Sequence, residues 1–275
     1  MLRNTLIVIV CLGLFTLTPF YQVLKSYAVM SVYSKAHELG SFLHDEDISI
    51  KMPGGLSTFK KDYYPFVMTY DTSTEYSERL NTDVDLVVLY NFGAMNWLSG
   101  SSLMYDVNSP YYSSFYGAYA ARYNELERQY GIDDSGEVDI AEIMEVTNFD
   151  LKVLVMESIG NQTPEVDYEV TNEDEPNKVE IDGILFDVYD ATIFMDGMMH
   201  EYRNDYMAYI QYGRPPQVEK PINSFEKIEA YGRIYVYFDY DTAISYFFYI
   251  IAPTMETIEE TQKNFIIPSK LKGIN

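Results

Sequence analysis

The chain has 275 residues, enough for one large domain or two small ones, and either could bury a hydrophobic core without disulfide bonds. Apolar residues make up 47% of the chain and aromatic residues 16%, a composition that excludes general disorder. The formal net charge of −23 disfavours binding to nucleic acids and to anionic lipid headgroups, because both present negative charge.

The N-terminal segment has the features of an export signal. Arg3 precedes the apolar run Leu6–Leu17, which has about the length of the apolar core of a signal peptide. Ser26-Tyr27-Ala28 supplies small residues at the two positions that signal peptidase requires before a cleavage after Ala28. Without cleavage, the same segment would serve as a membrane anchor. Residues 1–28 are therefore predicted to be a signal peptide or an N-terminal anchor, and residues 29–275 an exported acidic domain.

The distribution of charge and cysteine agrees with export. Residues 1–37 contain no acid, whereas all 42 acidic residues and all but two of the 19 basic residues follow Ala28. The one cysteine, Cys11, lies within the apolar run, so the exported domain has neither a disulfide bond nor a thiol nucleophile. Val8-Ile9-Val10 lacks the small residue that lipid attachment at Cys11 would need. Membrane association is expected only through residues 1–28.

After the export segment, the apolar pattern predicts a helix and then three strands. Apolar residues recur at helical intervals over Val29–Leu43, which predicts an amphipathic helix leading away from the membrane. Alternation over Ile48–Met52 predicts a strand that ends at a Pro-Gly-Gly sequence. The runs Tyr64–Tyr70 and Val84–Phe92 are rich in aromatic and β-branched residues and predict two further strands. The polar stretch Asp71–Asp83 is interpreted as a surface loop.

The middle of the chain is predicted to be helical. Aromatic residues recur every three or four positions over Tyr112–Tyr130, which predicts one helix that ends at Gly131. Asp139 and Glu142 have the spacing of a capping box at the start of a second helix. Asp150 is predicted to cap a third, short helix. The inward residues of that helix would be Leu151, Leu154 and Val155.

A long acidic stretch precedes the strongest hairpin signal in the chain. Thr163–Lys178 contains two prolines and is interpreted as a loop that holds any internal domain boundary. Asp182-Gly183 separates two short apolar runs, which predicts a β-hairpin. Helical spacing over Gly197–Tyr212 predicts a helix after the hairpin.

The C-terminal part predicts a second hairpin and a last helix. Arg233–Phe238 and Ala243–Ala252 are the two strands, and the second is apolar on both faces, so we expect it to be central and covered by helices. Pro253-Thr254 begins a helix with acidic residues early and Lys263 late, as the helix dipole favours. Strands near both ends with helices between and after them predict an α+β fold with a mainly antiparallel sheet and helices packed on it.

One segment partly matches a calcium-binding loop. Its predicted ligand positions are occupied by Asp133, Ser135, Glu137, Asp139 and Glu142. Gly136 occupies the required glycine position, but the first ligand position is Gly131 where a carboxylate is normal. The same residue types suit a polar turn followed by a capped helix, and we favour this second interpretation.

His200 is the best catalytic candidate among three histidines, because Arg203 and Asn204 share its predicted helical face. A general base also needs a nucleophile and an orienting acid, and the sequence does not identify either. Met198 and Met199 beside His200 could hold Cu(I), but methionine is a common core residue. The chain has no nucleophile elbow, no paired zinc-binding histidines and no phosphate-binding glycine loop.

Together these features predict a secreted or membrane-tethered binding domain without catalytic activity. Its expected partner is an envelope component or another extracytoplasmic protein. The first alternative is a cell-envelope hydrolase that uses carboxylates and His200. The second alternative is a structural module that binds calcium weakly, and calcium is the only cofactor that any of these interpretations requires.

Overall fold

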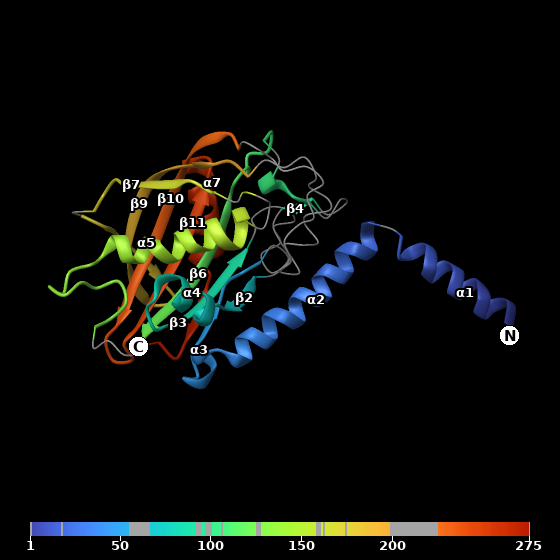
Figure 1. Ribbon diagram of the computed structural model, residues 1–275, viewed down its shortest axis with the longest axis horizontal. Helices are drawn as coiled ribbons and strands as arrows, with labels where there is room; N and C mark the ends of the chain where they lie inside the picture. Colours follow the sequence, from blue (N-terminus) through green and yellow to red (C-terminus); the bar gives the residue numbers. More distant parts are fainter. Residues whose placement is uncertain are drawn as a thin grey trace.

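The structure of the chain is a computed structural model (Figure 1). It describes residues 2–17, 19–54, 67–91, 95–96, 101–105, 107–124, 128–157, 161, 163–173, 175–198 and 225–274. The helical segments are α1 (Leu2–Phe15), α2 (Pro19–Gly40), α3 (Phe42–Asp45), η2 (Leu103–Tyr105), α4 (Ser73–Leu80), α5 (Ile140–Phe149), η3 (Asp150–Met156), α7 (Met255–Thr261) and η5 (Gln262–Ile266). The strands are β1 (Ser49–Lys51), β2 (Met68–Asp71), β3 (Val84–Asn91), β4 (Met95–Asn96), β5 (Ser101–Ser102), β6 (Phe115–Tyr123), β7 (Val166–Val170), β8 (Asn177–Ile181), β9 (Ile184–Asp196), β10 (Lys227–Asp239), β11 (Ile244–Ala252) and β12 (Lys270–Lys272).

One antiparallel sheet organises the described part of the chain. Its strand order is β2-β3-β6-β11-β10-β9-β7, and β8 also pairs with β9. A second pairing joins β1 to β12, so that a strand near the N-terminus lies beside one near the C-terminus. The helices pack on both faces of the large sheet (Figure 1). The predicted α+β class with a mainly antiparallel sheet is confirmed.

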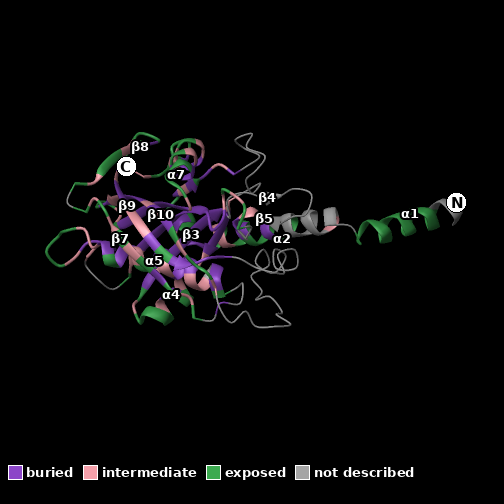
Figure 2. Cartoon of the chain, turned by 90° about the horizontal axis from the view of Figure 1, so that it is seen from above, coloured by how far each residue is buried: buried purple, intermediate pink, exposed green. Residues whose placement is uncertain are grey.

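Each face of the sheet has its own hydrophobic core (Figure 2). On one face, side chains of α4, α5 and η3 pack against residues such as Tyr119 and Phe247. On the other face, side chains of α3, α7, η5 and β1 pack against residues such as Tyr116 and Phe248. Every residue of β11 is buried, because this strand lies between β10 and β6 and is covered on both sides. Its predicted central position is confirmed.

Both predicted hairpins are present. In the β8–β9 hairpin, Ile181 pairs with Ile184, and the two turn residues between them, Asp182 and Gly183, have φ angles of 50° and 87°. Positive φ at both positions is what a two-residue type I′ turn requires, and Asp-Gly tolerates it. β10 and β11 form the second hairpin, in which nine pairs of residues lie opposite each other. The last helix is also present, and the Thr254 side chain caps it by accepting a hydrogen bond from the Thr257 backbone N–H at 3.2 Å.

The helix predicted over Tyr112–Tyr130 is wrong, because the middle of this segment is strand β6. β6 is buried on both faces, so apolar residues occupy consecutive positions and no alternation identifies a strand. Gly117 allows the close packing here: a Cβ atom at this position would lie 2.5 Å from Tyr249 Oη and 2.6 Å from the Leu89 carbonyl oxygen. Gly131 has a φ of 84°, but it occupies a turn and does not end a helix.

Two predicted loops contain regular structure. Asp71–Asp83 holds α4, which the sequence does not reveal because Tyr76 is its one buried residue. Thr163–Lys178 holds β7 and the start of β8. In β7 the acidic residues Asp167 and Glu169 face outward and alternate with less exposed residues, as in a half-buried strand at the sheet edge. Strands from before and after this segment belong to the same sheet.

α2 covers the edge of the large sheet. The predicted helix over Val29–Leu43 is confirmed, although α2 begins earlier, at Pro19, and ends at Gly40. The Ser34 hydroxyl oxygen accepts a hydrogen bond from the Thr69 backbone N–H at 2.8 Å, and His37 Nδ1 accepts one from the Asp71 backbone N–H at 3.0 Å. These bonds satisfy donors of β2 that face away from β3, and they protect an edge that could otherwise pair with another chain.

Replacing Ser34 by alanine should therefore open this edge locally. We expect the Thr69 amide hydrogen to exchange about fivefold faster, because the lost bond contributes about 1 kcal/mol. Hydrogen exchange followed by NMR measures this change directly. The matched control is Ser31→Ala on the same helix, because Ser31 forms no hydrogen bond with the described residues of β2. Equal Thr69 exchange rates in both variants would contradict the proposed role of Ser34.

α1 extends away from the domain and is connected to it through α2 (Figures 1 and 2). Its apolar side chains are exposed, with Leu6 at 63% and Leu12 at 59% of their full accessible surface. Its 14 residues span about 21 Å at ~1.5 Å per residue. Among the described residues, no helix combines the length and the hydropathy needed to cross a membrane.

Candidate functional site

A groove of about 300 Å³ lies where α2 and α3 meet the β2–β3 end of the large sheet. Its floor is formed by Thr69, Val87 and Leu89, which share one face of the sheet because Thr69 pairs with Leu89 and Val87 lies two residues before Leu89. One wall comes from the end of α2 and from α3, and the other from β1 and β12. Ligand pockets have volumes of roughly 300–1,000 Å³, so this groove could hold a small molecule.

The α3 wall is fixed by its own short-range contacts. The Ser41 hydroxyl donates a hydrogen bond to the Glu38 carbonyl oxygen at 2.9 Å and closes the chain reversal between α2 and α3. Leu43 is buried in the core below the groove, which anchors α3 to the sheet. His44 lies beside Leu43 and is exposed at the groove.

The opposite wall depends on ion pairs that hold the C-terminal strand in place. Lys272 Nζ lies 2.8 Å from Asp47 Oδ1, and this hydrogen bond holds the pKa of Asp47 below its ordinary value. Asp182 accepts hydrogen bonds from the Leu271 backbone N–H at 2.9 Å and from Lys270 Nζ at 2.7 Å. The tip of the β8–β9 hairpin and the chain reversal before β1 therefore both fix β12.

The polar groups of the groove differ in whether they are already paired. Glu38 is paired with Lys35 at 2.8 Å, and Asp47 is paired with Lys272. Lys51 forms neither a hydrogen bond nor an ion pair with any described residue. Thr69 as a whole is 8% exposed, and its hydroxyl, which is not fully enclosed, has no hydrogen-bond partner in the described part of the chain. Among the residues that the structure describes, the groove thus presents one unpaired lysine and one unpaired threonine hydroxyl beside an apolar floor.

The predicted calcium ligands are divided among three local structures. Asp133 Oδ1 accepts hydrogen bonds from the Ser135 hydroxyl at 2.7 Å and from the Ser135 and Glu137 backbone N–H groups at 2.8 and 2.9 Å. These bonds hold the pKa of Asp133 below its ordinary value, and the bond from the Ser135 side chain contributes most. Asp139 caps α5 by accepting a hydrogen bond from the Glu142 backbone N–H at 3.0 Å. The predicted turn and helix cap are confirmed.

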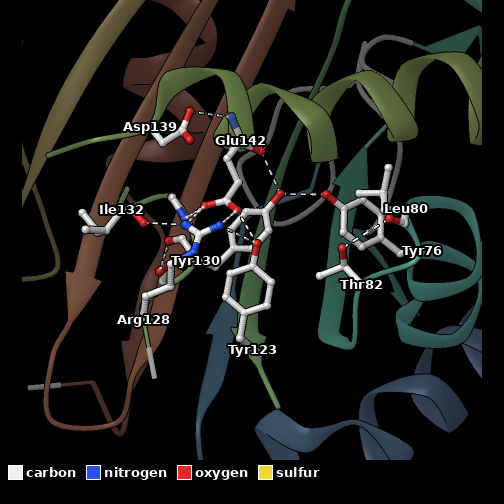
Figure 3. Close-up of polar contacts among 11 residues, drawn as sticks. Tyr76, Leu80, Thr82, Tyr123, Arg128, Tyr130, Ile132, Asp139 and Glu142 are labelled. Atoms are coloured by element: carbon white, nitrogen blue, oxygen red, sulfur yellow. Dashed lines mark hydrogen bonds and ion pairs between the residues drawn. The ribbon is translucent and has the colours of Figure 1, made fainter. Parts of the chain in front are cut away.

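The Glu142 carboxylate points toward Arg128 and Tyr123 (Figure 3). It is ion-paired with Arg128, with N–O distances of 2.6 and 2.9 Å, and it also accepts hydrogen bonds from the Gly131 backbone N–H at 2.6 Å and from the Tyr123 hydroxyl. Within the described ranges, no group of three or more His, Cys, Asp or Glu side chains is placed to hold a metal ion. Calcium binding by Asp133, Ser135, Glu137, Asp139 and Glu142 stays a prediction.

His200 lies outside the described residues, as do Arg203, Asn204 and nearly all of the helix predicted over Gly197–Tyr212. The prediction of a catalytic base therefore remains a prediction. Of the two methionines beside His200, the structure describes Met198. It is fully buried in the hydrophobic core, in agreement with a packing role.

Asp150 is a buried acid that the sequence did not reveal. The predicted helix cap at this position is wrong, because α5 continues directly into the π-helical segment η3 and Asp150 is an internal residue of that continuous helix. The predicted inward residues Leu151 and Val155 are buried, while the side chain of Leu154 lies outside the described part. Asp150 is 1% exposed, and its Oδ2 accepts a hydrogen bond from the Tyr249 hydroxyl.

The surroundings of Asp150 favour its neutral form. Burial raises the pKa of Asp150 to about 7, although the Tyr249 hydrogen bond acts in the opposite direction. Its second oxygen, Oδ1, and the hydroxyl of the nearby Tyr168 have no hydrogen-bond partner among the described residues. A small cavity of about 20 Å³, lined in part by Tyr168 and Tyr249, could hold no more than one water molecule. Asp150 can therefore exchange a proton near neutral pH, but it has no room for a substrate.

The groove is the described feature best suited to bind another molecule. No protein-family model, curated protein or solved structure matches this chain. Its function must therefore be argued from its own residues, and the open groove offers more to a ligand than the closed Glu142 and Asp150 clusters do.

Proposed function

We propose that this chain is an extracytoplasmic binding domain, secreted or tethered to the membrane by its N-terminal segment, that acts without catalysis. The observation that carries the proposal is the exposure of the apolar side chains of α1, which contact no core of the domain. An apolar helix that stays in water is costly, at about 25 cal/mol per Å² of apolar surface. Recognition by the export machinery, or insertion into lipid, removes that cost.

The distribution of charged residues along the chain supports export of the domain. Arg3 is the one charged residue before Pro19, and the acidic residues all follow residue 37. Membrane insertion favours an arrangement in which the basic N-terminus stays in the cytoplasm. The acidic domain that follows is then on the exported side. The expected partner is an envelope component or another extracytoplasmic protein. The groove supports a binding role, because both of its acids already have basic partners and are not poised as a catalytic pair.

Cell fractionation tests this proposal. The full chain with a C-terminal epitope is produced in its native host, and protease is added to intact cells or spheroplasts. We expect the epitope to be digested without lysis. Sequencing of the N-terminus would then separate secretion, in which the mature protein begins at Val29, from tethering, in which residues 1–28 remain and the protein pellets with membranes.

A pair of matched variants links the result to the apolar run. Leu12→Asp places a charge within α1 and should leave the epitope protected inside the cell. Leu39→Asp changes another exposed leucine, in α2, and should leave export unchanged. The proposal fails if the unprocessed wild-type chain is soluble and protected from protease in intact cells.

A further inference from the structure

We propose that the groove between α3 and the β1–β12 pair binds a small carboxylic acid with a compact apolar body. This inference deepens the proposed binding function by naming the ligand class. It depends on the charge of Lys51, the hydroxyl of Thr69 and the apolar floor of the groove, each of which restricts the ligand in a different way.

The charge of the groove selects a single negative group. Glu38 and Asp47 already have basic partners, so neither is available to bind a cationic ligand. Within the described part of the chain, Lys51 has no such partner and is the free charge of the groove. A ligand with one carboxylate would neutralise it, and a charge-assisted hydrogen bond to an ammonium group is among the stronger polar contacts. A phosphate would bring a second negative charge close to Glu38 and Asp47 without a second free cation to balance it.

The floor of the groove supplies one polar contact within an apolar surface. Thr69 is more than nine-tenths buried, and its unpaired hydroxyl lies on the same sheet face as Val87 and Leu89. The hydroxyl oxygen of Thr69 is not fully enclosed, so it can donate a hydrogen bond to a ligand oxygen that enters the groove. Val87 and Leu89 then offer contact to a hydrocarbon body next to that oxygen.

The size of the groove limits that body. At about 300 Å³ it lies at the lower end of the range for ligand pockets, roughly 300–1,000 Å³. A ring or a short branched chain fits this volume, whereas a folded polymer segment does not. The ligand is therefore a free small acid, and neither the C-terminus of a protein nor a long lipid chain is expected to enter fully.

Three probes with the same ring and different head groups test the inference. Cyclohexanecarboxylate, cyclohexylmethanol and cyclohexylmethylamine are titrated into the full chain in a mild detergent, and binding is measured by isothermal titration calorimetry. We expect the carboxylate to bind with a Kd on the order of 0.1–1 mM, and the alcohol and the amine about tenfold more weakly or not at all. Partition into detergent or onto α1 would not favour the acid in this way.

Variants at the groove locate the binding. Lys51→Ala should weaken carboxylate binding about tenfold, whereas Lys51→Arg should retain most of it because the charge is kept. Thr69→Val removes the hydroxyl with little change in shape and should weaken binding about threefold, and Thr69→Ser should restore it. Lys178→Ala removes an exposed lysine that is paired with Asp187 and should have no effect.

The inference is overturned if the carboxylate shows no saturable binding, if the amine binds equally well, or if Lys51→Ala binds as tightly as the wild type. Failure here leaves the fractionation result unaffected. Conversely, a chain that binds the acid through Lys51 but stays in the cytoplasm would contradict the proposed location and leave the ligand class intact.

Discussion

The Asp150→Asn variant is expected to be more stable than the wild-type protein by about 2 kcal/mol at pH 8, and to have no such advantage at pH 5. Asp150 is buried, and only one of its two carboxylate oxygens has a hydrogen-bond partner. The ionised form is therefore poorly stabilised in the folded protein. Asparagine has nearly the same shape, carries no charge at any pH and can still accept the hydrogen bond of Tyr249.

The direction of the pH dependence follows from the raised pKa. Burial moves the pKa of Asp150 from 3.8 to about 7, so between these values the folded protein holds a proton that the unfolded chain has lost. The stability that this proton contributes is fully present below pH 3.8 and is lost as the pH rises through 7. The full loss corresponds to about 4 kcal/mol at ~1.36 kcal/mol per pKa unit. We expect a smaller gain in the variant, because the asparagine NH₂ group must also find an acceptor.

Urea denaturation at pH 5 and pH 8 measures the effect as a change in midpoint at a constant slope. The control is Asp134→Asn, which removes an exposed carboxylate from the 131–142 turn. This control accounts for the general benefit of reducing the negative charge of an acidic protein. If the wild type, Asp150→Asn and Asp134→Asn lose stability in parallel as the pH rises, Asp150 is not the group responsible.

Elements defined by a local signal could be predicted from the sequence. The β8–β9 hairpin is an example, because Asp182 and Gly183 tolerate the positive φ angles that the turn requires, and that requirement is local. The cap of α5 is another, since the Asp139 side chain needs only the backbone N–H three residues later. In both cases the residues that decide the conformation are neighbours in the chain.

β6 shows why a local pattern can fail. Aromatic residues spaced by four, such as Phe115, Tyr119 and Tyr123, fit one face of a helix equally well. In the fold, β3 and β11 flank β6 within the sheet, and consecutive residues of β6 point to two different cores because helices cover both faces of the sheet. That arrangement depends on partners far away in the sequence, so propensity and spacing alone could not reveal it.

The candidate site was hidden for the same reason. The groove combines residues near the N-terminus, two strands of the large sheet and Lys272 near the C-terminus, and no motif connects them. Asp150 was misinterpreted because aspartate is common at helix caps, and the continuation of α5 into η3 leaves it inside the helix instead. A buried acid has the same sequence signal as an exposed one, so only the packing of α5 and η3 on the sheet distinguishes them.

Replacing Arg128 by methionine should destabilise the protein by about 3 kcal/mol, because it leaves the nearly buried Glu142 carboxylate without its cation. Glu142 has a 9% exposed side chain, and it joins α5 to the segment before it through Arg128 and Gly131 (Figure 3). Methionine keeps much of the length of the arginine stem, so the loss measures charge and hydrogen bonding more than packing.

A double-mutant cycle isolates the pair from its surroundings. Glu142→Gln removes the charge that Arg128 balances, so the added cost of Arg128→Met should be about 2 kcal/mol smaller in the Glu142→Gln background. The more exposed pair Lys178–Asp187, with side chains 59% and 35% exposed, provides the comparison, and its cycle with Lys178→Met and Asp187→Asn should give a coupling of about 1 kcal/mol or less. Both cycles are measured by urea denaturation at pH 7. Because the two pairs differ chiefly in burial, equal coupling energies would mean that burial of Glu142 does not strengthen its dependence on Arg128.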